Sequence, residues 1–229
     1  MFTIDWELVK QELEDNGFCK IENVINKEDC DNLINHYDDS DLYRNTINME
    51  RYRFGIGEYK YFHYPLSDRI KTIREYFYTN LSFIANDWNQ KIKLNNYSYP
   101  KNLYEFLRIC NENQQTKATP LILKYTENGY NCLHQDIYGE VYFPFQLVVS
   151  LSEREEYQGG ENIFVKQIPR AQSRGYSVSL NKGDGIIFST KHCPIKGKKG
   201  YYKGTLKHGV STILSGERYG LGVIFHDAQ

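Results

Sequence analysis

The first half of the chain carries apolar residues at helical spacing. In the first segment they recur three or four positions apart and stop at Gly17, a typical C-terminal helix cap. A short strand is expected at 18–25, and Asn26 before an acidic first turn marks the start of a second helix. The same spacing predicts a long helix over 70–84 and another over 103–110. This half is therefore expected to be mainly helical.

After Pro120 the pattern changes to short apolar runs separated by Gly, Asn and Asp. These runs are expected to be strands: 121–125, 143–151, 162–167, 177–180, 185–188, 204–208 and 220–225. Short strands at this density favour a double-sheet β-roll over a parallel sheet with helical crossovers. We therefore expect a mainly β fold with helices, in one domain, with residues 118–229 as the core and residues 1–117 as a helical support.

Composition narrows the class of protein. A chain of 229 residues, 40% of them hydrophobic, is long enough for a single domain with a proper core. The formal net charge is −1, so the whole molecule has no bias toward nucleic acid or membrane. A balanced sum can still hide a local basic patch.

The five cysteines are widely spaced, odd in number and include no Cys-x-x-Cys pair. We therefore expect a reducing compartment, with neither a disulfide framework nor a structural zinc site. The N-terminus has acidic residues where a signal peptide needs basic and then apolar ones, and no run of about 18 apolar residues occurs. These features predict a soluble, cytoplasmic protein.

A metal site is indicated by His134 and Asp136, two positions apart. On an extended chain, residues two apart project to the same side and can reach one ion. His208 is the best third ligand, and His226, in the last strand, is its main rival. Two imidazoles and one carboxylate are the facial ligand set of non-heme iron(II) oxygenases, which leaves positions open for a bidentate 2-oxo acid and O₂. Zinc prefers four-coordinate sites and suits these partners less well.

A 2-oxo acid also needs an anchor for its far carboxylate, and Arg pairs with carboxylates in bidentate fashion. Arg218 lies ten residues after His208. If 206–213 and 218–225 are neighbouring strands, Arg218 returns beside His208. Tyr125, nine residues before His134, is expected to point its phenol into the same cavity.

These motifs resemble the iron(II)/2-oxoglutarate dioxygenase superfamily, in the order and spacing of its prolyl-hydroxylase-type branch: Tyr125-x-x-x-Gly129, His134-x-Asp136, Gly159-Gly160-Glu161, Gly183-Asp184-Gly185, His208 and Gly216-Glu217-Arg218. The Leu133-His134-Gln135-Asp136 tetrapeptide is also similar to the AlkB-like nucleic-acid repair branch. Almost the whole chain resembles a little-characterised bacterial 2-oxoglutarate/iron(II) oxygenase family described as acting on damaged nucleic acid, through the segments 51–62, 169–174 and 222–227.

The resemblance implies a double-stranded β-helix (jelly-roll) fold and iron bound by His134, Asp136 and His208. It implies 2-oxoglutarate held by Arg218 with help from Tyr125, O₂ as the second co-substrate, and hydroxylation or oxidative demethylation of a substrate. In the repair branch the arginine lies farther from the distal histidine and a second arginine follows. The ten-residue spacing here matches the hydroxylase branch.

The substrate therefore stays open at this stage. An alkylated base is one possibility. A protein side chain, a free amino acid or a small metabolite is another, and a metal-binding β-roll without turnover is a third. Candidate substrate contacts are Arg53 and Tyr59, in a Gly- and aromatic-rich segment that suits a lid, and Arg174. The lysine-rich stretch 191–207 is either a solvated loop with a frayed edge strand or a phosphate-contacting lip.

Overall fold

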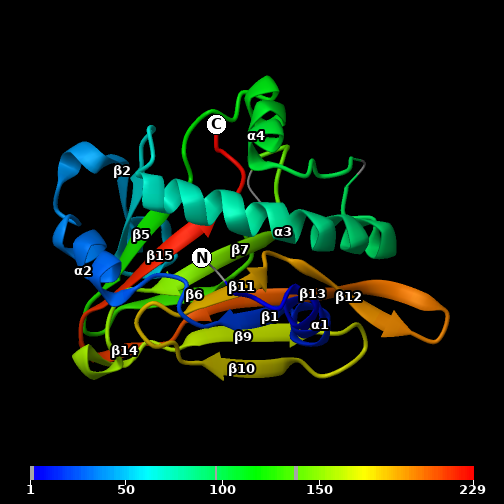
Figure 1. Cartoon of the computed structure of the whole chain (residues 1–229). Helices are drawn as coiled ribbons and strands as arrows, with labels where there is room; N and C mark the ends of the chain where they lie inside the picture. The colour runs from blue at the N-terminus through cyan, green and yellow to red at the C-terminus, as the bar shows by residue number, and fades with distance from the viewer. Residues whose placement is uncertain (1–2, 96, 137–138) are drawn as a thin grey trace.

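The computed structural model describes residues 3–95, 97–136 and 139–229. Their strands form two large antiparallel sheets packed on each other and one two-stranded sheet (Figure 1). Over these residues, the seven strands of the major sheet are ordered β1 (Phe18–Ile21), β11 (Gly185–Ser189), β7 (Phe145–Ser150), β15 (Arg218–Ile224), β5 (Leu121–Tyr125), β4 (Glu58–Phe62) and β2 (Tyr43–Asn48). The minor sheet is ordered β10 (Arg174–Val178), β9 (Asn162–Gln167), β13 (Gly200–Val210), β6 (Tyr130–His134) and β3 (Gly55–Ile56). β12 (His192–Gly197) pairs with β13, and β8 (Tyr157–Gly159) pairs with β14 (Ile213–Gly216). The predicted mainly β roll with helices is confirmed.

The helices follow the sequence signals for their ends. They are α1 (Trp6–Asn16), α2 (Lys27–Asn35), α3 (Asp68–Ile92) and α4 (Leu103–Glu112), with the short 3₁₀ turns η1 (Ser40–Leu42), η2 (Glu50–Tyr52) and η3 (Arg154–Glu156). The side chains of Asp5, Asn26, Ser67 and Asn102 cap the four α-helices by accepting hydrogen bonds from first-turn amides. The long α3 lies across the major sheet (Figure 1).

Aromatic packing joins α3 to the major sheet and forms the main core. The Trp88 ring lies edge-on to Phe145 of β7, with centroids 4.7 Å apart, and Tyr78 lies 4.8 Å from Phe143. The buried guanidinium of Arg74 pairs with Asp227 at 2.7 Å and so ties α3 to the end of the chain. Among the described residues, no helix combines the length and apolar character needed to cross a membrane.

The N-terminal half contributes more β structure than the helical pattern indicates. The predicted strand at 18–25 ends at Ile21, and β1 pairs with β11 of the C-terminal half. β2 and β4 extend the major sheet beyond β5, while β3 pairs with β6 of the minor sheet. β2 and β4 are short and rich in Tyr, Asn and Lys, so they carry little apolar alternation. They form strands because they pair with neighbouring strands of the sheets through backbone hydrogen bonds.

One predicted strand pairing is wrong. We expected the strand that carries His208 to lie beside the strand that carries Arg218, but β13 belongs to the minor sheet and β15 to the major sheet. The intervening residues form β14, which pairs with β8. The chain therefore crosses from one sheet to the other between His208 and Arg218, and the two residues lie on different layers of the roll.

Candidate active site

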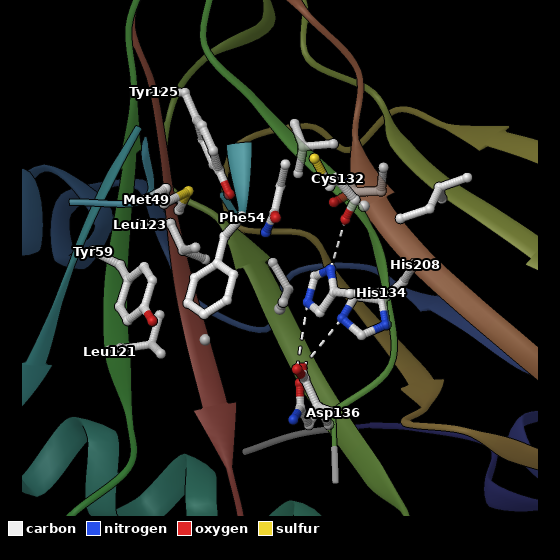
Figure 2. A pocket seen from close by; sticks show the side chains of 18 of the residues that line it. Met49, Phe54, Tyr59, Leu121, Leu123, Tyr125, Cys132, His134, Asp136 and His208 are labelled. Atoms are coloured by element: carbon white, nitrogen blue, oxygen red, sulfur yellow. Dashed lines mark hydrogen bonds and ion pairs between the residues drawn. The ribbon is translucent and has the colours of Figure 1, made fainter. Parts of the chain in front are cut away.

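Two histidines and an aspartate meet where β6 ends beside β13. His134 is the last residue of β6 and the antiparallel partner of His208. The two carboxylate oxygens of Asp136 lie 3.4 Å from His134 Nε2 and 3.2 Å from His208 Nε2. One ligand atom from each of the three residues lies within 4.8 Å of the other two (Figure 2). The structure thus brings together the three residues that the sequence singled out, and their spacing suits a single metal ion.

Hydrogen bonds hold this cluster in a ligating arrangement. His134 Nδ1 lies 2.7 Å from the carbonyl oxygen of Cys132, which can only accept, so Nδ1 carries the proton and Nε2 faces the cluster. The Asp136 amide donates to the carbonyl of Thr190 at 3.2 Å. Between the two ligands, Gln135 Nε2 donates to the carbonyls of Leu206 at 3.0 Å and Lys191 at 3.4 Å.

The three groups also adjust one another's protonation. Burial disfavours the charged form of Asp136, but hydrogen bonds and charge from both histidines hold the pKa of its carboxyl well below the usual range. Burial lowers the pKa of His208, and Asp136 opposes that shift. Burial also opposes protonation of His134, yet its bond to Asp136 leaves its pKa raised. The result is an ionised carboxylate between two imidazoles, the donor set that Fe(II) takes in oxygenases.

The cluster opens into a cavity of about 320 Å³ between the two sheets. One wall comes from β5, β7 and β15 of the major sheet, and the other from β6, β9 and β13. The turn that precedes β3 covers one side with Phe54, whose side chain reaches between the cluster of His134, Asp136 and His208 and β5 (Figure 2). The lining is mostly apolar with a few polar groups, as in small-molecule sites.

Arg218 and Tyr125 lie in this cavity as antiparallel partners on β15 and β5. The Arg218 side chain is 1% exposed, and its Nη2 donates to Asn162 Oδ1 at 3.0 Å. Within the described residues, its Nε and Nη1 have no hydrogen-bond partner and no carboxylate lies within ion-pair distance. Burying a charged guanidinium with unused donors destabilises the folded protein unless an anion accepts hydrogen bonds from those donors. The residues present therefore fit a ligand with a free carboxylate.

Close packing around Arg218 and Tyr125 leaves no room for a side chain at two neighbouring glycine positions. Gly160 has φ of +67°, and a Cβ there would lie 2.4 Å from Ile213 Cδ1 and 3.0 Å from Arg218 Cδ. A Cβ on Gly57 would lie 2.8 Å from the Tyr125 ring. Burial raises the pKa of Tyr125 to about 12, against the charge of Arg218, so the phenol is neutral and able to donate at neutral pH.

Other candidate residues divide between the cavity and the surface. Arg53 and Tyr59 line the cavity. Arg174 does not, because it lies exposed on β10 with its guanidinium 4.6 Å from the Tyr176 ring centre. His226 stands apart from the cluster of His134, Asp136 and His208 and is buried, with Nδ1 accepting from the Phe143 amide at 3.2 Å. The stretch Lys191–Lys207 includes a regular hairpin of β12 and β13, not a loop.

Sequence reasoning missed Gln135, Asn162 and Phe54. The first two are ordinary polar residues whose role depends on partners more than 50 positions away in the chain. Phe54 lies in a turn whose path over the cavity is fixed by the bond from the Cys132 amide to its carbonyl. No local pattern marks such contacts.

A double-sheet roll with a two-histidine, one-carboxylate cluster and a buried arginine in one cavity defines the class of Fe(II)/2-oxoglutarate oxygenases, which take Fe(II) as cofactor and 2-oxoglutarate and O₂ as co-substrates. Within this class the chain belongs to the family described as oxygenases catalysing oxidative methylation of damaged DNA, whose model matches residues 57–228. The resemblance drawn from the motifs is thereby confirmed, and the protein is an oxidoreductase.

The chain is also similar to proteins of related sequence and to solved structures of related fold. Uncharacterized proteins from two strains of Mycobacterium tuberculosis are 44% identical over 165 residues, which cover 72% of this chain and 70% of each relative. A Pseudomonas putida prolyl-4-hydroxylase superposes with a TM-score of 0.56 at 12% identity, covering 98% of this chain and 100% of its own. A Trichoplax adhaerens prolyl hydroxylase gives 0.56 at 13% identity, covering 95% and 86%. At such identities these structures support the fold alone.

Proposed function

We propose that His134, Asp136 and His208 hold Fe(II) in this oxygenase. The support is the convergence of their ligand atoms, the proton of His134 fixed on Nδ1 by the Cys132 carbonyl, and the ionised Asp136. When bound, the iron supplies the activation of O₂ that couples oxidative decarboxylation of 2-oxoglutarate to oxidation of a C–H bond. The protein's share is to orient the ligands and to shield the cavity from water.

We further propose that Arg218 binds the far carboxylate of 2-oxoglutarate and that Tyr125 donates a hydrogen bond to it. The observation that carries this proposal is the buried guanidinium with two unused donors, in the same cavity as the metal cluster. A bidentate carboxylate would use those donors and neutralise the charge. Asn162 then acts as a positioning residue, because its bond to Nη2 sets the direction of the guanidinium plane.

For the substrate, we propose an N-methylated base in nucleic acid, as the family's description suggests. A cavity of about 320 Å³ suits one base taken out of its stack, not an intact duplex. Arg53 and the exposed Phe54 line the cavity, and the Phe54 ring is stacked on Tyr52 with centroids 5.5 Å apart. Aromatic faces beside a cation are suited to holding a flipped base. Tyr59, also in the lining, would contact the same base.

The net reaction would consume one O₂ and one 2-oxoglutarate for each methyl group oxidised. The hydroxymethyl product then leaves as formaldehyde and the base regains its N–H, alongside succinate and CO₂. The test is to incubate the iron-loaded enzyme with a single-stranded oligonucleotide carrying one N-methylated base and to measure formaldehyde and the oligonucleotide mass. Loss of one methyl group in step with succinate supports the proposal. Succinate formed at the same rate with and without every methylated oligonucleotide would contradict the substrate assignment.

We also propose that the chain acts as a single domain, since β1, β3 and β4 of the first 117 residues pair with strands of the catalytic half. The five free cysteines support a proposed reducing, cytoplasmic location.

A further inference from the structure

The β12–β13 hairpin concentrates positive charge on one element. Six lysines lie in the lysine stretch (Lys191, Lys196, Lys198, Lys199, Lys203 and Lys207), and no Asp, Glu or Arg occurs anywhere from 185 to 216. The whole chain has a formal charge of −1, so the rest of the molecule is acidic. The charges of the protein are therefore segregated, and this hairpin is its basic part.

The lysines of the hairpin are available to a partner. All but Lys191 are exposed, and across the described ranges none of the six forms an ion pair with an acidic side chain. Elsewhere exposed or partly exposed lysines do pair, such as Lys27 with Glu153 at 2.7 Å. Six cations held close together without counter-charges repel one another, and such an arrangement is suited to a polyanion.

The hairpin also projects from the body of the roll. β13 pairs with β9 only from Thr205 onward, whereas its pairing with β12 continues to Gly200. The outer part is thus a two-stranded ribbon that extends past β9 and β10 (Figure 1). Tyr201 and Tyr202 on it are 38% and 41% exposed, which adds aromatic faces beside the lysines.

This ribbon begins beside the cluster of His134, Asp136 and His208. Gln135, between the ligands His134 and Asp136, donates to carbonyls at the base of the hairpin, those of Lys191 and Leu206. Lys199 lies nine residues before His208 in the chain, a reach of about 30 Å along an extended strand. That is roughly the length of nine stacked nucleotides.

From these observations we infer that the β12–β13 hairpin binds the phosphate backbone of the nucleic-acid strand whose modified base enters the cavity. The inference rests on the proposed function and deepens it, because it names the surface that holds the flanking nucleotides. The hairpin contributes affinity without reading sequence, since lysines contact phosphates as point charges.

The experiment measures binding of an unmodified, fluorescently labelled single-stranded DNA of about 20 nucleotides over a range of salt concentrations. The test variant is Lys198→Gln/Lys199→Gln/Lys203→Gln. The matched control is Lys71→Gln/Lys101→Gln/Lys117→Gln, which removes three exposed lysines, also without ion pairs in the described part of the chain, far from the hairpin in sequence. We expect the test variant to bind at least tenfold more weakly at low salt, with a salt slope reduced by about 2, and the control to match the wild type.

Two further measurements sharpen the outcome. An oligonucleotide of about 4 nucleotides whose methylated base occupies the cavity is too short to reach Lys198 from there, so the part of its binding that depends on the methyl group should not distinguish the test variant from the wild type. The variant Lys198→Arg/Lys199→Arg/Lys203→Arg should retain binding to the longer DNA. Equal affinity and equal salt slope for the glutamine variant and the wild type would overturn the inference. So would hairpin-dependent binding to anionic phospholipid vesicles without binding to DNA.

Failure of this inference and failure of the proposed function give different results. Demethylation of a methylated oligonucleotide with hairpin-independent binding overturns the hairpin surface alone. Hairpin-dependent DNA binding without turnover of any methylated oligonucleotide supports the surface and overturns the substrate assignment.

Discussion

Arg218 and Tyr125 are direct partners in the β5–β15 ladder, with the guanidinium carbon 5.7 Å from the centre of the Tyr125 ring. Both belong to the major sheet, whereas His134 and His208 belong to the minor sheet. A co-substrate that contacts both the arginine and the metal must therefore bridge the two layers of the roll. The carboxylate of such a co-substrate would supply the acidic partner that the arginine lacks within the described residues.

The first prediction concerns the variant Arg218→Met, which keeps the aliphatic stem and removes the charged donors. Loss of charge-assisted hydrogen bonds to a carboxylate costs about 1.5–3 kcal/mol, so the dissociation constant of 2-oxoglutarate should rise about 10- to 100-fold. Calorimetric titration of 2-oxoglutarate into the metal-loaded protein measures the change. Metal binding should be unaffected, and the exposed Arg108→Met should behave as the wild type. An unchanged dissociation constant would exclude Arg218 as the anchor.

The sequence predicted the candidate residues on both sheets but not how the two sheets place them relative to one another. His134, Asp136 and Arg218 were identifiable because their residue types and spacing have a chemical purpose. The assumed adjacency of the strands at 206–213 and 218–225 failed, since β14 diverts the chain to the other sheet. Strand order depends on contacts between distant segments, such as β1 with β11, which no local pattern contains.

The second prediction concerns Asp136→Ala. Removing the only carboxylate of the cluster leaves two imidazoles, which should weaken Fe(II) binding by more than about 100-fold and abolish turnover. Metal content after dialysis and titration with Mn(II) as a redox-stable substitute provide two independent readouts. Glu140→Ala, an exposed carboxylate four residues away, is the control. Retention of stoichiometric metal by Asp136→Ala would refute the proposed ligand set.

The third prediction concerns Gln135, which is neither a proposed metal ligand nor a lining residue of the cavity. Its amide joins the ligand-bearing segment to Leu206 and Lys191, so Gln135→Met should loosen the ligands while preserving side-chain volume. We expect metal affinity to fall about 10- to 100-fold, as for other residues that orient ligands. Saturating metal should restore most of the activity, which separates a positioning role from a catalytic one. Activity that stays low at saturating metal would contradict that role.

The last prediction concerns pH and His226. Burial lowers the pKa of this histidine to about 4, helped by the nearby charge of Arg74 and opposed by Asp136. The unfolded chain takes up a proton near the ordinary pKa of about 6.5, whereas the folded protein does not until about pH 4. The free energy of unfolding therefore decreases as the pH falls through this window, by up to about 3 kcal/mol from this residue.

In His226→Asn an amide oxygen replaces Nδ1 as acceptor for the Phe143 amide, without a titrating group. Urea unfolding between these pH values should show a shallower loss of stability in the variant than in the wild type, while the exposed His36→Asn follows the wild type. Parallel stability curves for His226→Asn and the wild type would mean that His226 is not held neutral by the fold.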